Sequence, residues 1–135
     1  MSYGVAAALQ EAVYQRLLAD PVLTGLVGTD IFDAAPPGTV PTTYVVIGPE
    51  EAHERGDGTG RGAVHEFTVS VVTSAAGFLS AKEVAAAVSD ALSGADLVLA
   101  RGRLVYLNFL HATARRVQGA DIRRIDLRFA ARVED

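Results

Sequence analysis

The clearest element of the chain is a strand near its C-terminal end, marked by strict alternation of apolar and polar residues. One face of that strand carries Ile125, Leu127, Phe129, Ala131 and Val133, and the other carries Arg124, Asp126, Arg128, Arg132 and Glu134. A second alternating run places His65, Phe67, Val69, Val71 and Thr73 opposite Glu66, Thr68 and Ser70. A period of two is typical of strands that bury one face, so both runs predict strands of a sheet.

Two other segments have helical spacing. In residues 3–19 the apolar positions recur every three or four residues, and the helix ends at Asp20-Pro21 because the residue before a proline avoids helical geometry. Pro21 to Leu26 predicts one short extra turn. The second helix spans Phe78 to Leu92, where Ser80-x-x-Glu83 has the spacing of a capping box and Ser93-Gly94 supplies the stop.

Shorter apolar runs complete the predicted sheet. Tyr44–Gly48 predicts a buried strand, and Ile31-Phe32 a brief one inside a proline-rich loop. Leu97–Ala100 and Leu104–Ala114 predict two further strands, joined by the two-residue turn Arg101-Gly102. This order of elements predicts an α+β fold, with two helices packed on one face of a mainly antiparallel sheet of about five strands. We expect residues 1–135 to form a single domain, because the length fits one core.

The run from Leu104 to Leu110 is apolar on both of its faces. Val105, Leu107 and Phe109 alternate with Leu104, Tyr106 and Leu110. One interpretation is a central strand that is covered on both sides of the sheet. The other is a strand with one face against the protein's own helices and the other against a neighbouring subunit. The sequence leaves both interpretations open.

Composition and motifs act mainly by exclusion. Half of the residues are hydrophobic, which is enough for a core, and cysteine is absent, which excludes disulfides and thiol nucleophiles. The chain lacks a Gly-x-Ser-x-Gly elbow and a Walker-type phosphate loop, and its three histidines are scattered rather than set at metal-ligand spacing. No apolar run is long enough to span a membrane. We therefore expect a protein that is not an enzyme, with no catalytic residue, cofactor, metal or membrane partner.

Charge is divided unevenly along the chain. Residues 1–100 contain 4 basic and 12 acidic side chains, whereas residues 101–135 contain 8 arginines and 4 acidic side chains. Such a division suits nucleic-acid binding or head-to-tail binding of a second copy. Sparse aromatic residues and a single lysine favour a partner-facing sheet surface. The candidate subunit or tube contacts are Arg115, Arg116, Arg124, Arg128 and Arg132. Reversing Arg124, Arg128 and Arg132 to glutamate is predicted to abolish assembly and leave melting nearly unchanged.

A polar, glycine-rich stretch from Pro49 to Gly62 separates two of the predicted strands. Its glycines could cradle a phosphate, but phosphate loops lie between a strand and a helix, and this stretch lies between two strands. We expect a loop that is mobile in the free subunit and becomes ordered on a partner when the protein assembles. Its candidate contacts are Glu54, Arg55, Asp57 and Arg61.

Short motifs in a fixed order resemble one known family. The N-terminal half contains Leu26-Val27-Gly28, Ile31-Phe32-Asp33, Pro36-Pro37 and Tyr44–Gly48. The alternating strand around Phe67, an alanine-rich helix, Leu104–Phe109 and Ile125–Ala131 follow in the family's order. Over nearly its whole length the chain is similar to the tail-completion (tail terminator) proteins of long-tailed phages and phage-like gene transfer agents. The segment Pro41-Thr42-Thr43-Tyr44 departs from the family, in which proline often runs straight into the aromatic residue.

This resemblance implies a structural assembly protein with a tail-terminator-like domain. It implies a six-membered ring of identical copies that caps the tail tube, ends its polymerisation and provides the head-docking surface. The implied partners are the tail tube protein and a head-completion or connector protein, with DNA only as cargo passing through the ring. The implied location is the head-proximal end of the tail in a virion or gene transfer agent particle, assembled in the bacterial cytoplasm. The alternatives are a head-side connector or neck ring protein and, from a different class, a small ligand-binding α+β domain.

Overall fold

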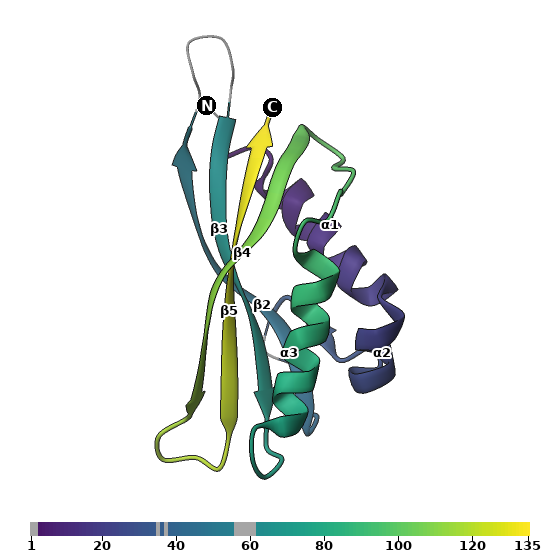
Figure 1. Cartoon of the computed structure of the whole chain (residues 1–135), viewed down its shortest axis with the longest axis vertical. Helices are drawn as coiled ribbons and strands as arrows, with labels where there is room; N and C mark the ends of the chain where they lie inside the picture. The colour runs from purple at the N-terminus through teal and green to yellow at the C-terminus, as the bar shows by residue number, and fades with distance from the viewer. Residues whose placement is uncertain (1–2, 35, 37, 56–61) are drawn as a thin grey trace.

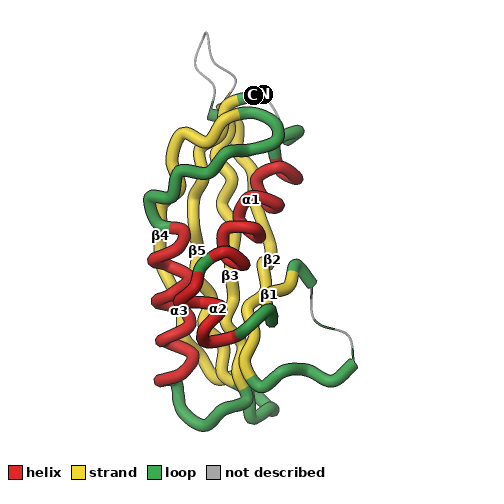
Figure 2. The backbone as a smooth tube through the Cα atoms, turned by 90° about the vertical axis from the view of Figure 1, so that its right-hand side faces the viewer, coloured by secondary structure: helices red, strands yellow, loops and turns green. Residues whose placement is uncertain are grey.

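Helices lie on one face of a five-stranded sheet in the computed structural model, which describes residues 3–34, 36, 38–55 and 62–135 (Figures 1 and 2). The helices in this part of the chain are α1 (Ala6–Ala19), α2 (Pro21–Val27) and α3 (Leu79–Leu92). The strands are β1 (Ile31–Phe32), β2 (Thr43–Glu54), β3 (Gly62–Thr73), β4 (Arg103–Arg116) and β5 (Arg123–Glu134). The predicted α+β class, with helices on one face of the sheet, is confirmed.

The sheet is mainly antiparallel, and its two edges are β1 and β4. The spatial order of the strands is β1-β2-β3-β5-β4. β1 pairs with β2 in parallel, and the remaining neighbours pair in antiparallel. The helical layer faces the reader in Figure 2, with the sheet behind it. The opposite face of the sheet carries none of the described helices.

The core lies between the sheet and the helices, as the alternating patterns predict. β5 buries all five of its predicted inward residues, and β3 buries its predicted row from His65 to Thr73. The helices contribute apolar residues at helical spacing, among them Leu9, Val13 and Leu17 from α1 and Val84 and Val88 from α3. Alternation identifies these strands correctly because each packs one row of residues against the helices and carries polar residues on its other face.

The extra turn predicted after Pro21 is a helix of its own. Asp20 caps it, since the Asp20 side chain accepts a hydrogen bond from the backbone N–H of Leu23 at 2.9 Å. Proline at the first helical position needs no N–H partner, and Gly28 ends α2 with a φ of 62°. The described residues therefore hold three helices, whereas the sequence analysis counts two.

The capping box predicted at Ser80 does not form. α3 begins at Leu79, one residue earlier, and its N-cap position is Phe78, which makes no side-chain capping bond. Ser80 lies inside the first turn, where its hydroxyl is no longer placed to cap the helix. The predicted stop is confirmed in outline, because Ser93 is the C-cap and Gly94 adopts a φ of 69°.

The predicted loop from Pro49 to Gly62 is wrong in its first part, because β2 continues to Glu54. Its register on β3 shifts between Ile47 and Glu50, and then pairing resumes through Glu54↔Ala63. A bulge at this point accommodates Pro49, which has no N–H to donate to the ladder. Backbone pairing with β3 therefore makes this polar segment a strand rather than a loop. Residues 56–61 lie outside the described residues.

The strand predicted over Leu97–Ala100 is also wrong, and so is its hairpin through Arg101-Gly102. This segment belongs to the connection between α3 and β4, and its residues form none of the described strands. Leu97 and Leu99 pack against the core, whereas Val98 between them is 94% exposed. An extended connection that buries alternate residues therefore has the same apolar pattern as a strand.

The interpretation of Leu104–Leu110 as a central strand is wrong, because β4 is an edge of the sheet. Leu104 and Leu107 are buried. The other apolar residues of the run are 39–44% exposed, namely Val105, Tyr106, Phe109 and Leu110. The second interpretation, burial against a neighbouring subunit, stays a prediction.

Candidate assembly interface

The C-terminal half of β4 is an open edge of the sheet. From Asn108 to Arg116 every residue of the strand is exposed, and β5 is its only neighbour in the sheet. The N-terminal half of β4 is partly covered by the connection from α3, since the Leu107 carbonyl accepts a hydrogen bond from the Gly94 N–H at 2.8 Å. An open edge presents unpaired backbone groups, and this one carries the exposed Phe109 and Leu110 as well. These features are typical of a strand that meets another chain.

An apolar groove adjoins this edge, between β4 and α3. Its volume is ≈ 260 Å³, and its lining is Lys82, Ala85, Ala86, Ser89, Phe109, Ala112, Ala114, Ile125 and Leu127. The alanine-rich sequence of α3 sets small side chains opposite the small residues of β4, so the space between helix and strand stays unfilled. This groove is a second feature on the same side of the molecule that suits a protein partner.

The other edge of the sheet, at β1 and β2, is flanked by acidic residues. A hollow between the start of α1, β1 and the bulge of β2 is lined by Glu11, Asp33 and Glu50 together with Tyr3, Ala6, Ala7 and Gln10. The Tyr3 hydroxyl donates a hydrogen bond to Glu50 Oε1 at 2.7 Å. This bond, and the charge of Glu50 beside it, raise the pKa of the Tyr3 phenol. Two unlike surfaces therefore flank one sheet, an apolar one at β4 and an acidic one at β1 and β2.

Glu50 is held from a second direction by a buried histidine. His65 is fully buried, and its Nδ1 lies 3.4 Å from Glu50 Oε2. The rings of Tyr3 and His65 stack with their centroids 6.0 Å apart. These contacts fix the Glu50 carboxylate at the bulge of β2, so the acidic side of the fold has a defined geometry.

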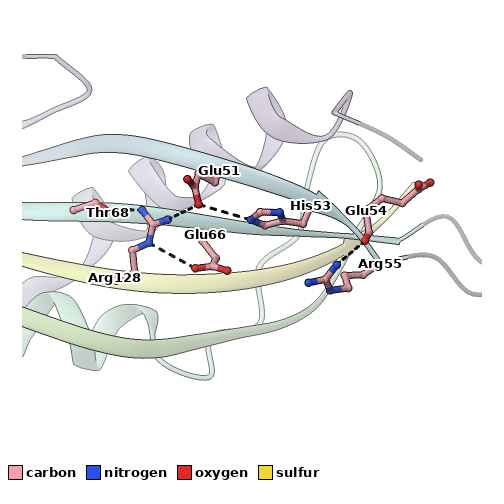
Figure 3. A network of polar contacts seen from close by, with 7 residues as sticks. All are labelled: Glu51, His53, Glu54, Arg55, Glu66, Thr68 and Arg128. Atoms are coloured by element: carbon pink, nitrogen blue, oxygen red, sulfur yellow. Dashed lines mark hydrogen bonds and ion pairs between the residues drawn. The ribbon is translucent and has the colours of Figure 1, made fainter.

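The helix-free face of the sheet carries a network of charged side chains. Arg128 donates to Thr68 Oγ1 at 3.1 Å and lies 3.5 Å from Glu51 and 3.8 Å from Glu66 (Figure 3). Glu51 also lies 3.7 Å from His53. Because Arg128 contacts two carboxylates and a hydroxyl of its own sheet, its positive charge is largely neutralised within the subunit.

Arg124 is matched in the same way. Its Nε lies 2.8 Å from Asp126 Oδ1, and its terminal nitrogen donates to Ser70 Oγ at 3.1 Å. Ser70 Oγ in turn donates to Asp126 at 2.5 Å. This closed triad, formed across β3 and β5, binds the two strands together on the helix-free face.

The predicted interface residues fall in three places rather than one. Arg124, Arg128 and Arg132 lie on the helix-free face of β5, and Arg115 and Arg116 lie at the end of the open edge β4. The side chains of Arg115 and Arg116 are more than half exposed, although each lies within 4 Å of an aspartate, Asp126 and Asp121 respectively.

The remaining predicted contacts belong to the end of the β2–β3 pair. Glu54 ends β2, and the Arg55 N–H donates to the Gly62 carbonyl at 2.9 Å. Figure 3 includes Glu54 and Arg55, with the Arg55 guanidinium donating to the Glu54 carbonyl. Asp57 and Arg61 lie outside the described residues, so the predicted ordering of this segment on a partner stays a prediction.

Sequence reasoning missed the groove and the acidic hollow. The only signals for the groove are the alanine stripe of α3 and the two apolar faces of Leu104–Leu110. The hollow joins Glu11, Asp33 and Glu50, which are far apart in the chain and meet only in the fold. Within residues 3–34, 36, 38–55 and 62–135, no cluster of histidine, aspartate and glutamate could hold a metal ion, and no helix is long and apolar enough to cross a membrane.

A comparison with protein families assigns most of the chain to one family. Residues 11–134 match the family described as "Tail completion protein gp17". The chain therefore belongs to the tail completion protein gp17 family, and it is a tail structural protein of the phage type.

One solved structure carries the assignment further. The chain is 65% identical to a chain of the "Virion of native gene transfer agent (GTA) particle", with a TM-score of 0.94 over 99% of this chain and 100% of that one. No curated protein matches the chain. The resemblance indicated by the sequence motifs is confirmed, and the match to a virion agrees with the predicted place in such a particle.

Proposed function

We propose that this protein forms a ring that caps the tail tube, ends its polymerisation and provides the surface on which the head docks. The observation that carries the proposal is the pair of unlike surfaces on the two sides of one sheet. A surface that meets a different surface of the next copy makes a heterologous contact, and such contacts form a ring when the rotation between copies closes. A ring of six copies is what the resemblance to tail terminators implies.

Strand directions support an edge-to-edge contact between copies. β1 runs parallel to β2, and three antiparallel pairings then connect β2 to β4, so β1 and β4 run in opposite directions. Rotation about an axis along the strands keeps these directions in every copy. The β1 edge of one copy would therefore meet the β4 edge of the next in antiparallel orientation, the slightly more stable arrangement.

The two ends of the sheet would then form the two flat faces of the ring. One end holds Glu54 and Arg55, and the other holds Arg115 and Arg116 (Figure 1 shows both ends of the sheet). We assign one of these faces to the tail tube protein and the other to the head-completion or connector protein. DNA would pass through the central opening as cargo.

The alternatives predict different assemblies. A head-side connector or neck ring would use the same lateral surfaces but would not set the length of the tail. A small ligand-binding domain would need a pocket of roughly 300–1,000 Å³. The apolar groove, at ≈ 260 Å³, is smaller than that range, whereas the acidic hollow, at ≈ 410 Å³, lies within it. The groove therefore favours a protein partner over a small ligand.

Deletion of the gene, followed by electron microscopy of the particles, tests the proposal. We expect tails of uncontrolled length that fail to join heads, and complementation with the intact gene should restore particles of normal length. Tails of normal length that fail to join heads would favour the connector alternative. Normal tails joined to heads would reject both assembly functions.

A further inference from the structure

The apolar groove and a projecting segment lie on opposite sides of the fold. Residues 38–42, which lead into β2, extend away from α3 and β4 and form the green loop at the lower right of Figure 2. The groove lies at the other side of the sheet, between α3 and β4. In a head-to-tail ring, the projecting segment of one copy faces the groove side of its neighbour.

The register of the sheet puts β1, the edge strand on the side of the projecting segment, at the level of the groove along the strands. Ile31 of β1 pairs with Val45, which pairs with Val71, then with Ile125 and finally with Ala114. Ala114 and Ile125 both line the groove. Because rotation about an axis along the strands preserves height, the region beside β1 in one copy arrives at the groove of the next copy.

The projecting segment has side chains that suit the groove. Val40 is 52% exposed, and Pro41 follows it. Proline restricts the backbone, so a segment of this kind loses less conformational entropy when it docks. The alanines that line the groove leave space for an apolar side chain to enter.

Charge agrees with the same orientation. Lys82 lies at the groove, and Arg115 and Arg116 end the strand that borders it. The acidic hollow that contains Glu11, Asp33 and Glu50 lies on the side of the projecting segment. A second copy of this chain therefore presents an apolar segment flanked by acidic residues to an apolar groove flanked by basic ones.

We infer that the groove between α3 and β4 is the seat for residues 38–42 of the adjacent copy, with Val40 as the inserted side chain. This inference rests on the proposed ring and names its lateral contact. A segment of the tail tube protein is the rival occupant of the groove, and the experiment below distinguishes the two.

A cysteine pair tests the contact, since the chain has no cysteine of its own. Val40→Cys and Ala112→Cys are introduced together, particles are purified, and disulfides are formed with a mild oxidant. We expect a ladder of covalent oligomers on a non-reducing gel, in steps of the 14.1 kDa subunit, that collapses to monomer on reduction. The largest rung reports the number of copies in the ring.

A matched control uses Val22→Cys with Ala112→Cys, because Val22 is 64% exposed on α2 and away from the projecting segment. Rings in the particles with no Val40–Ala112 ladder, or an equal ladder from the control, would overturn the inference and leave the proposed function standing. A bond from Ala112→Cys to a cysteine introduced in the tube protein would assign the groove to the tube. Particles that contain no ring of this protein would overturn the proposed function itself.

A second variant keeps the test decisive if the cysteine pair blocks assembly. Ala86→Trp fills the groove from α3, where Ala86 is exposed. We expect at least a tenfold loss of completed particles while the unfolding midpoint of the purified subunit stays unchanged. The control Leu79→Trp, at a position 74% exposed on the same helix, should assemble normally. Normal assembly of Ala86→Trp would overturn the inference.

Discussion

β4 and β5 form one hairpin, yet they have opposite environments. β5 has a strand on each side and buries Phe129 completely, whereas β4 has only one neighbouring strand and leaves Phe109 41% exposed. The two rings touch across the hairpin, with centroids 5.8 Å apart. The difference shows that apolar character alone does not assign a residue to the core. The position of a strand in the sheet decides how far its side chains are covered. β5 lies between β3 and β4, whereas β4 lies at the edge.

The same contrast separates the arginines of the two strands. Arg124 and Arg128 of β5 have close partners on their own sheet, and their side chains are 31% and 20% exposed. Arg115 and Arg116 of β4 are 52% and 63% exposed, with ion-pair contacts of 3.8 and 3.6 Å. Charge on β5 therefore serves the subunit, and charge on β4 is available to a partner.

The largest effect is expected in the core of β5. Phe129→Ala should lower the free energy of unfolding by about 3–5 kcal/mol, because it deletes a fully buried ring and leaves a cavity. Phe109→Ala, across the same hairpin, should cost less than about 1.5 kcal/mol, since that ring is already partly in water. Denaturant unfolding of both variants measures the difference. Equal losses would contradict the contrast between the two strands.

The sequence predicts β5 and β3 well because their surroundings match their own pattern. Each has one face against the helices, so alternation from Ile125 to Val133 predicts the buried row on that face. The position of β4 is different, because two apolar faces fit both a central strand and an edge that meets another chain. Only the order of strands in space separates the two, and that order depends on contacts between distant segments.

The incorrect elements have a similar cause. Leu97 and Leu99 look like a strand because alternate residues of a connection are buried against the core. Residues Glu50–Glu54 look like a loop because they are polar, although the backbone ladder to β3 holds them in a strand. Side-chain character reports burial, whereas strand pairing depends on backbone groups, and the two differ at the edges of a sheet.

An intermediate effect is expected from charge reversal on β5. In the variant with Arg124, Arg128 and Arg132 replaced by glutamate, the change at Arg124 sets a new carboxylate beside Asp126, and the change at Arg128 sets one beside Glu51 and Glu66. We expect a loss of at least about 2 kcal/mol in the free energy of unfolding, since a single hydrogen bond to a charged group contributes roughly 1.5–3 kcal/mol. This revises the expectation from sequence that melting stays nearly unchanged. Thermal melting followed by circular dichroism measures the loss.

The matched control is reversal of Arg115 and Arg116 on β4. Exposed pairs contribute about 0.2–1 kcal/mol, so this double variant should melt close to the original protein. We expect it to reduce tail completion, which the β5 variant cannot test cleanly once it is destabilised. Unchanged melting of the β5 variant would show that its arginines are not used within the subunit.

The smallest effect on folding, with a large effect on assembly, is expected from Leu110→Glu on the open edge. Leu110 is 44% exposed and lies at the bulge of β4 opposite β5, so the free subunit keeps its core and should unfold within about 0.5 kcal/mol of the original. In the ring, the glutamate would lose water at the contact with the next copy and would place a charge beside the acidic side of that copy. Both effects oppose assembly, and burying a charge without a partner is strongly unfavourable.

The control Leu79→Glu changes a 74% exposed leucine on α3 and should assemble normally. Counting completed particles by electron microscopy, beside denaturant unfolding of each subunit, separates assembly from stability. If Leu110→Glu completes tails as well as Leu79→Glu does, the apolar residues of β4 do not meet another chain, and the contrast between β4 and β5 would need another explanation.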